Sequence, residues 1–146
     1  MRIAILGALF LGIVSVGLAG QKQKQAPAPP PCQDEEAMVG DYTKDLTSLT
    51  ATVKGEDLVA FQRAFHRKTC LTKLTFCVTM LDGAVACFEK AANDPATPKD
   101  QVEACKAKHD GYVKLKEKVS HYRDALKTTE DFKESKAMIE KFDFAN

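Results

Sequence analysis

Residues 56–92 read EDLVAFQRAFHRKTCLTKLTFCVTMLDGAVACFEKAA, a largely apolar stretch that contains three of the five cysteines of the chain. Apolar residues recur in it at steps of three and four, which is the spacing of one face of an α-helix. These residues are Leu58, Phe61, Phe65, Leu74, Cys77, Val78, Leu81, Val85 and Phe88. The pattern predicts a central helix, and Gly83 and the polar segment 66–69 are the two places where it could be interrupted.

An amphipathic pattern also precedes this stretch, in residues 33–54. Its apolar residues step by four, four, three and four, as expected for a helix that buries one face. They are Met38, Tyr42, Leu46, Leu49 and Val53. Acidic residues 34–36 suit the positive end of the helix dipole, and Gly55 suits a left-handed C-terminal cap.

A third helix is predicted after segment 93–98, because Pro98 suits a first helical position and Thr97 suits the N-cap. Its apolar stripe comprises Val102, Cys105, His109, Tyr112, Leu115, Val119, Tyr122 and Leu126. Thr128 and Asp131 signal a short fourth helix that carries Phe132, Ile139 and Phe142. No stretch alternates with the period of a strand. The predicted fold class is therefore all-α, a disulfide-stapled antiparallel bundle of three to four helices.

The first 19 residues have the pattern of a secretory signal peptide. Arg2 precedes an uncharged apolar run, and Gly17 and Ala19 are the small residues that a cleavage site requires. We place the cleavage after Ala19. The alternative is a retained anchor, although the run from Ile3 to Ala19 is shorter than the ~20 residues that span a bilayer.

The remaining chain divides into a tail and one domain. Residues 20–31 are rich in Gln, Lys and Pro, which predicts an extended flexible spacer. Residues 32–146 are long enough for a single helical domain with its own core. No second apolar span is recognised, so we expect a secreted, extracellular protein without a membrane span after signal cleavage.

The charges of the predicted mature chain are balanced. The whole chain has 21 Lys and Arg residues against 20 Asp and Glu residues, and cleavage removes Arg2. A nucleic acid or an anionic membrane surface requires a cationic face. Neither is therefore expected as the main partner.

The cysteines predict disulfides, because a secreted chain folds in an oxidising compartment. In an antiparallel helix pair the midpoint of a bridging pair should fall in the turn. Cys87 and Cys105 average to a position in segment 93–98, and Cys32 and Cys77 average to the turn at Gly55. We therefore predict these two disulfides. Cys70 remains either as a buried free thiol or as the site of an intermolecular disulfide in a homodimer.

The motifs of common enzymes are missing. The sequence has no nucleophile elbow, no glycine-rich phosphate loop and no histidine pair with metalloprotease spacing. His66 and Cys70 are four residues apart, but two ligands without a third do not make a metal site. We expect a non-enzymatic protein with no catalytic residue, no metal and no cofactor.

The run from Cys32 through Phe61 and Phe65 to Cys70, Cys77 and Cys87 resembles a family of small secreted, cysteine-rich helical domains known mainly from nematodes. The resemblance covers residues 32–105, and this chain has fewer cysteines than those domains usually carry. The family has no assigned activity. The resemblance therefore implies a non-enzymatic helical fold and adds no site residue.

Two functions remain. The first is an extracellular interaction protein, which should have a filled core and an exposed apolar patch for a protein partner. The second is a carrier of a small apolar ligand, such as a lipid or an odorant-like molecule, held between helices. Its predicted lining residues are Phe61, Phe65, Phe76, Phe88 and Tyr112.

Overall fold

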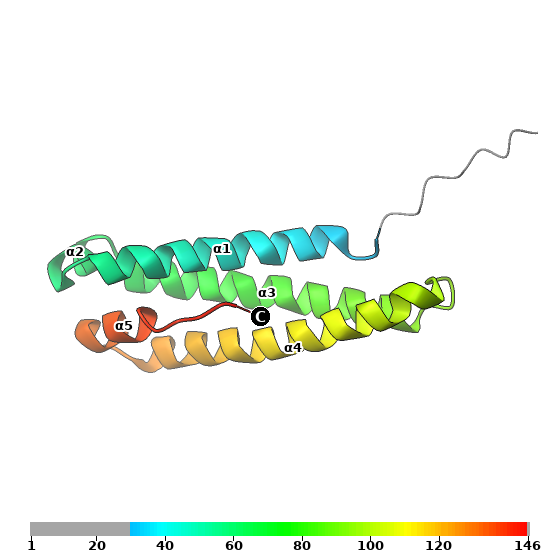
Figure 1. Cartoon of the computed structure of the whole chain (residues 1–146). Coiled ribbons are helices and arrows are strands. Elements are labelled where there is room, and N and C mark those ends of the chain that lie inside the picture. Colours follow the sequence, from blue (N-terminus) through cyan, green and yellow to red (C-terminus); the bar gives the residue numbers. More distant parts are fainter. Residues whose placement is uncertain (1–29, 146) are drawn as a thin grey trace, which may run out of the picture.

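The computed structural model describes residues 30–145 and confirms the all-α fold class (Figure 1). The predicted signal peptide and most of the predicted tail lie outside the described residues. The helices are α1 (Gln33–Gly55), α2 (Leu58–Arg63), α3 (His66–Asn93), α4 (Lys99–Thr128) and α5 (Phe132–Ile139).

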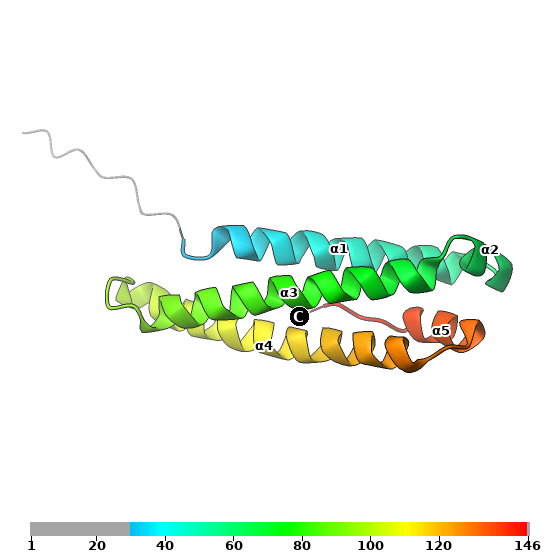
Figure 2. The same ribbon diagram turned by 180° about the vertical axis from the view of Figure 1, so that it is seen from behind.

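Three long helices form the body of the bundle, and α3 packs against both α1 and α4 (Figures 1 and 2). Neighbouring long helices run antiparallel, as predicted from the short connections. The short helices α2 and α5 contact each other and lie at the same end of the bundle. We call this end, opposite the α3–α4 turn, the α2–α5 end.

The predicted central helix is interrupted, but at neither expected place. The structure ends α2 at Arg63 and begins α3 at His66, and α3 continues through Gly83 without a break. The Asp57 carboxylate caps α2 by accepting a hydrogen bond from the Ala60 N–H at 2.8 Å. Phe65 then adopts a left-handed conformation with φ 53°, which turns the chain into α3. A non-glycine residue with this φ cannot continue a right-handed helix, so the break precedes the polar segment.

The buried face of α1 is rotated from the predicted stripe. Val39 is buried where the pattern placed Met38, which is exposed, and Thr50 joins the core. The hydroxyls of Thr43, Thr47 and Thr52 donate to carbonyls one turn earlier in α1, as Thr43 does to Val39 O at 3.0 Å. The predicted left-handed cap at Gly55 is wrong, since Gly55 has a negative φ and Glu56 ends the helix.

The stripe predicted for the third helix is largely confirmed in α4, but its predicted cap is not. The buried side chains of α4 are Cys105, Tyr112, Leu115, Val119 and Leu126. Pro98 occupies the N-cap position without a side-chain hydrogen bond. The preceding turn is closed instead by Asp94, whose Oδ1 accepts from the Ala96 N–H at 2.8 Å. The cap of α5 is Asp131, as the sequence indicated.

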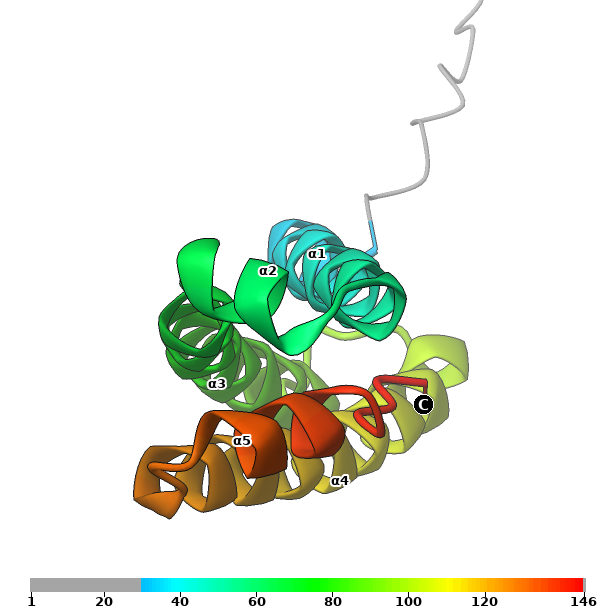
Figure 3. The same cartoon turned by 90° about the vertical axis from the view of Figure 1, so that its left-hand side faces the viewer.

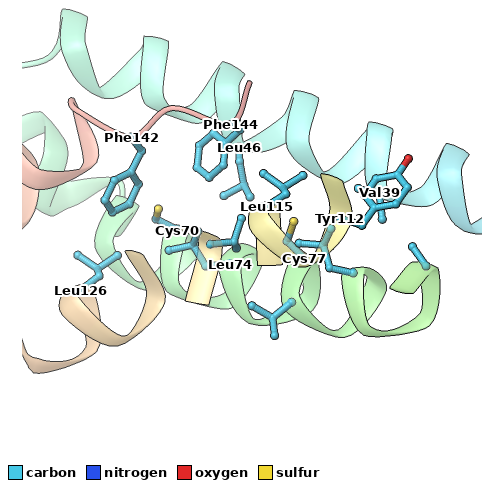
Figure 4. Packing of buried hydrophobic residues seen from close by; sticks show 14 of the residues in the cluster. Val39, Leu46, Cys70, Leu74, Cys77, Tyr112, Leu115, Leu126, Phe142 and Phe144 are labelled. Carbon is cyan, nitrogen blue, oxygen red and sulfur yellow. The ribbon is translucent and has the colours of Figure 1, made fainter. Parts of the chain in front are cut away.

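The C-terminal segment 140–145 completes the core between α1 and α4 (Figures 3 and 4). Phe142 and Phe144 are buried, and the Phe142 ring stacks on Tyr122 with centroids 4.3 Å apart. The three rings form one cluster, because Phe144 meets Tyr122 edge-on at 5.8 Å. This segment therefore takes the place that a fourth long helix has in a regular bundle.

Arg67 connects the beginning of α3 to the end of α4. Its Nε donates to the Thr129 carbonyl at 2.9 Å, and its Nη2 donates to the Leu126 carbonyl at 3.1 Å. The last carbonyls of a helix have no partner within it, so a guanidinium there satisfies them and favours the negative end of the dipole. These two bonds hold α3 and α4 in register near the α2–α5 end.

Helix α3 is long and apolar enough to cross a membrane by length and composition, with a mean hydropathy of 1.4 over 18 residues. The core helix of a bundle satisfies the same criterion. In this fold eight α3 side chains are buried, and the helix lies between α1 and α4. Burial in the core therefore accounts for the apolar composition of α3.

The disulfide joins Cys32 to Cys87, with Cα atoms 5.8 Å apart. Both predicted pairs, Cys87–Cys105 and Cys32–Cys77, are therefore wrong. The midpoint of Cys32 and Cys87 falls within α2, because the connection between α1 and α3 spans residues 56–65 rather than the single turn at Gly55. Cys105 lies on α4, as predicted, but it is a free buried thiol.

We expect the double variant Cys32→Ser/Cys87→Ser to lose about 4 kcal/mol of unfolding free energy, the loop-closure value for a loop of this length. Urea denaturation would measure the loss. Wild-type protein in dithiothreitol should lose a similar amount, whereas the double variant should not respond to the reductant. A peptide map that joins Cys87 to Cys105 would contradict this assignment.

Candidate functional site

Exposed apolar side chains gather at the α2–α5 end. Six large hydrophobic residues are exposed in the described part of the chain. Four of them lie on α2, on α5 or at the start of α3. These four are Leu58, Val59, Phe65 and Phe132. We call them the end patch. Phe65 is the most exposed, at 70 %.

The backbone at Phe65 explains why its ring points away from the core. The Phe65 N–H donates to the Gln62 carbonyl at 3.1 Å, and its carbonyl accepts from the Thr69 N–H at 3.0 Å. Its left-handed conformation costs a bulky side chain about 1–2 kcal/mol, which glycine would avoid. Contacts of neighbouring residues maintain this strained backbone conformation, and the Phe65 ring nevertheless stays exposed.

Those surrounding contacts come from Glu56, Phe61 and His66. The His66 Nε2 lies 3.0 Å from Glu56 Oε1 and 2.9 Å from Oε2, which ties the end of α1 to the start of α3. The fully buried Phe61 ring faces the His66 ring at 6.1 Å. Segment 56–66 is thus fixed on both sides of Phe65, so that the exposed ring stands on a supported loop.

The five aromatic residues predicted to line a ligand pocket do not come together. Phe61, Phe88 and Tyr112 are core residues, and Phe88 stacks on Tyr112 with centroids 5.6 Å apart. Phe65 and Phe76 are exposed. Phe65 and Phe88 lie at opposite ends of α3, roughly 35 Å apart at 1.5 Å per helical residue. Phe76 instead stacks on Tyr42 of α1, at 6.3 Å.

The three free cysteines are buried side chains of the core. Cys70 and Cys77 point from α3 into the bundle, and Cys105 is buried on α4 (Figure 4). Desolvation by burial raises the pKa of Cys70 to about 12 and that of Cys77 to about 11. The Cys70 environment matches the predicted alternative of a buried thiol. An intermolecular disulfide would require its sulfur to leave the core.

One group in the described residues has the spacing of metal ligands, and it consists of Cys32, Glu35 and Cys87. The two sulfurs are bonded to each other in the disulfide. A disulfide sulfur is not a thiolate, which is the form that binds metal. This group therefore offers a cation only the carboxylate of Glu35.

Sequence periodicity missed most of the end patch. It placed Leu58 and Phe65 on the buried stripe and Phe132 on the apolar side of the fourth helix, and it did not single out Val59. The break before α3 changes the phase of the helix, so residues before it do not share the face of those after it. The one sequence signal near Phe65 was the polar segment 66–69 that follows it, which indicated a possible interruption of the helix.

These observations define the class of protein as a disulfide-linked α-helical bundle with an exposed apolar end. No family model matches the chain, and no curated protein and no solved structure matches it either. The resemblance to the nematode domains therefore stays a prediction.

The three free thiols should resist alkylation in the native protein. Iodoacetamide reacts with the thiolate. Burial keeps all three thiols inaccessible, and the raised pKa values of Cys70 and Cys77 keep those two protonated at pH 8. Mass spectrometry should find no rapid modification of Cys70, Cys77 or Cys105 in buffer and three modifications in urea. Rapid labelling of Cys70 would contradict its burial, whereas a covalent dimer that the Cys70→Ser variant abolishes would favour the intermolecular alternative.

Replacing Phe65 by Asn should raise the unfolding free energy by about 1 kcal/mol, because Asn tolerates the left-handed conformation and the exposed ring contributes little burial. Thermal or urea unfolding would measure this gain. Val59→Asn is the matched control in the same patch, and its effect should stay within about 0.5 kcal/mol. Marked destabilisation by Phe65→Asn would show that the ring is packed rather than presented.

Proposed function

We propose that this is a secreted, non-enzymatic helical protein that binds an extracellular protein partner through the end patch. The observation that carries the proposal is the exposure of Phe65 in a strained backbone conformation. Strained conformations are retained where the surrounding structure enforces them, and they concentrate at functional sites. Here the strain places an aromatic ring in solvent.

The chemistry of the end patch suits a protein partner. Fully burying an exposed Phe, Val or Leu side chain contributes about 1.5–3 kcal/mol. The sequence neighbours of the patch, including Gln62, Arg63, Lys68 and Lys133, are exposed and polar. An apolar centre with a polar rim is the usual organisation of a protein interface.

The compartment is supported by the disulfide. A cross-link between Cys32 and Cys87 persists in an oxidising environment, as outside the cell. It closes the end of the bundle opposite the end patch, where the end of α3 meets the start of α1. The patch is therefore distant from the disulfide and is positioned by packing and by hydrogen bonds such as those of His66 and Arg67.

Photo-crosslinking at Phe65 tests this proposal. The residue would be replaced by p-benzoylphenylalanine, an aromatic of similar shape, and the protein irradiated with extracellular fluid of the source tissue. Phe76 is the matched control, since it is an exposed Phe on the same helix, 50 % exposed, and far from the α2–α5 end. We expect a discrete product at position 65 that position 76 does not give.

Competition makes the result specific. Unlabelled wild-type protein should suppress the crosslinked product, and the Phe65→Ala variant should compete about tenfold or more weakly, as expected when an interface loses a central aromatic anchor. Identical products at positions 65 and 76, or equal competition by the two unlabelled proteins, would refute binding through the end patch.

A further inference from the structure

The bundle leaves a gap between α1 and α4. Both helices pack on α3 but make few contacts with each other, and the space between them is filled along part of its length by α5 and segment 140–145 (Figure 3). The buried rings of Phe142 and Phe144 occupy that part. Ala145, the last residue that the structure describes, borders a hollow of about 680 Å³.

This hollow, which we call the α1–α4 groove, has an apolar floor and a basic rim. Gly111, Tyr112 and Leu115 form the floor, and Lys108, Lys114 and Lys118 surround it. These residues recur at steps of three and four, so that they share one face of α4. Tyr112 and Leu115 project from α4 toward α1 (Figure 4). The volume lies within the range of about 300–1,000 Å³ for small-molecule sites.

The lysines of the rim differ in their partners. Lys108 pairs with Glu36 of α1 and lies over the Phe88 ring, 5.5 Å from its centroid. Lys118 donates to the Ala145 carbonyl at 2.9 Å and lies 3.8 Å from Asp143 Oδ2. Lys114 has no acidic partner among residues 30–145. Lys114 is therefore the rim lysine whose positive charge is not balanced by an acidic partner among these residues, and it stands beside an apolar surface.

We propose that the α1–α4 groove binds a long-chain fatty acid. The carboxylate pairs with Lys114, and the alkyl chain covers the floor of Gly111, Tyr112 and Leu115. Charge-assisted hydrogen bonds orient the head group, and burial of the chain supplies the affinity. A small inorganic anion would gain nothing from the floor, and an uncharged lipid would leave Lys114 unpaired. The site is independent of the end patch.

Gly111 offers a blocking variant that should keep the fold. A Cβ at Gly111 would meet no atom within 4 Å, so Gly111→Leu has open space for its first side-chain atom at a position that lines the groove. Gly83 of α3 also has open space around a Cβ and lies outside the groove. Leucine is a better helix former than glycine at both positions. Gly83→Leu is therefore the matched control.

Isothermal titration calorimetry with monomeric laurate tests the proposal. Wild type and Gly83→Leu should bind one laurate per chain, and Gly111→Leu should lose the binding. Lys114→Gln should weaken laurate binding about two- to fivefold, the range for an exposed ion pair, and leave the binding of dodecanol unchanged. Three results would overturn the proposal. Wild type could fail to bind laurate, Gly111→Leu could bind it as wild type does, or wild type could bind dodecanol as tightly as laurate. Binding of an acidic peptide instead of laurate would likewise overturn it.

Discussion

The structure depends on the packing of α3 against two helices at once. Leu74, Cys77, Leu81 and Ala84 lie fully buried along α3, and Phe88 joins them near its end. Each large side chain contributes about 1.5–3 kcal/mol by leaving water, so this seam supplies much of the stability of the bundle. Because α3 is shared, α1 and α4 take positions on either side of it and not against each other.

The gap that results from this arrangement determines two other features. Segment 140–145 enters it and buries Phe142 and Phe144, which contribute apolar area that α1 and α4 do not bury on each other. Within residues 30–145 the segment fills part of the gap, and the α1–α4 groove is the hollow beside Ala145. Core and groove thus have one origin, the absence of a fourth long helix from the described bundle.

The two ends of the bundle are held by different means. The disulfide between Cys32 and Cys87 closes one end covalently. At the other end, Arg67 caps α4 and His66 lies at hydrogen-bond distance from Glu56, so hydrogen bonds take the place of a cross-link. That end also carries Phe65, and its polar contacts support a loop conformation that local sterics disfavour.

The sequence by itself determined the all-α class, the approximate bounds of α1 and α4, the end of α3 and the buried face of α4, because a 3.6-residue period and the proline-containing boundary at 93–98 are local signals. Only the tertiary structure decided which cysteine pairs with Cys32 and which aromatic residues are exposed. Helical periodicity says which residues share a face, but not which neighbour that face meets. The pairing depended on the length of the α1–α3 connection, and the exposure of Phe65 depended on a left-handed residue that shifts the phase of the helix.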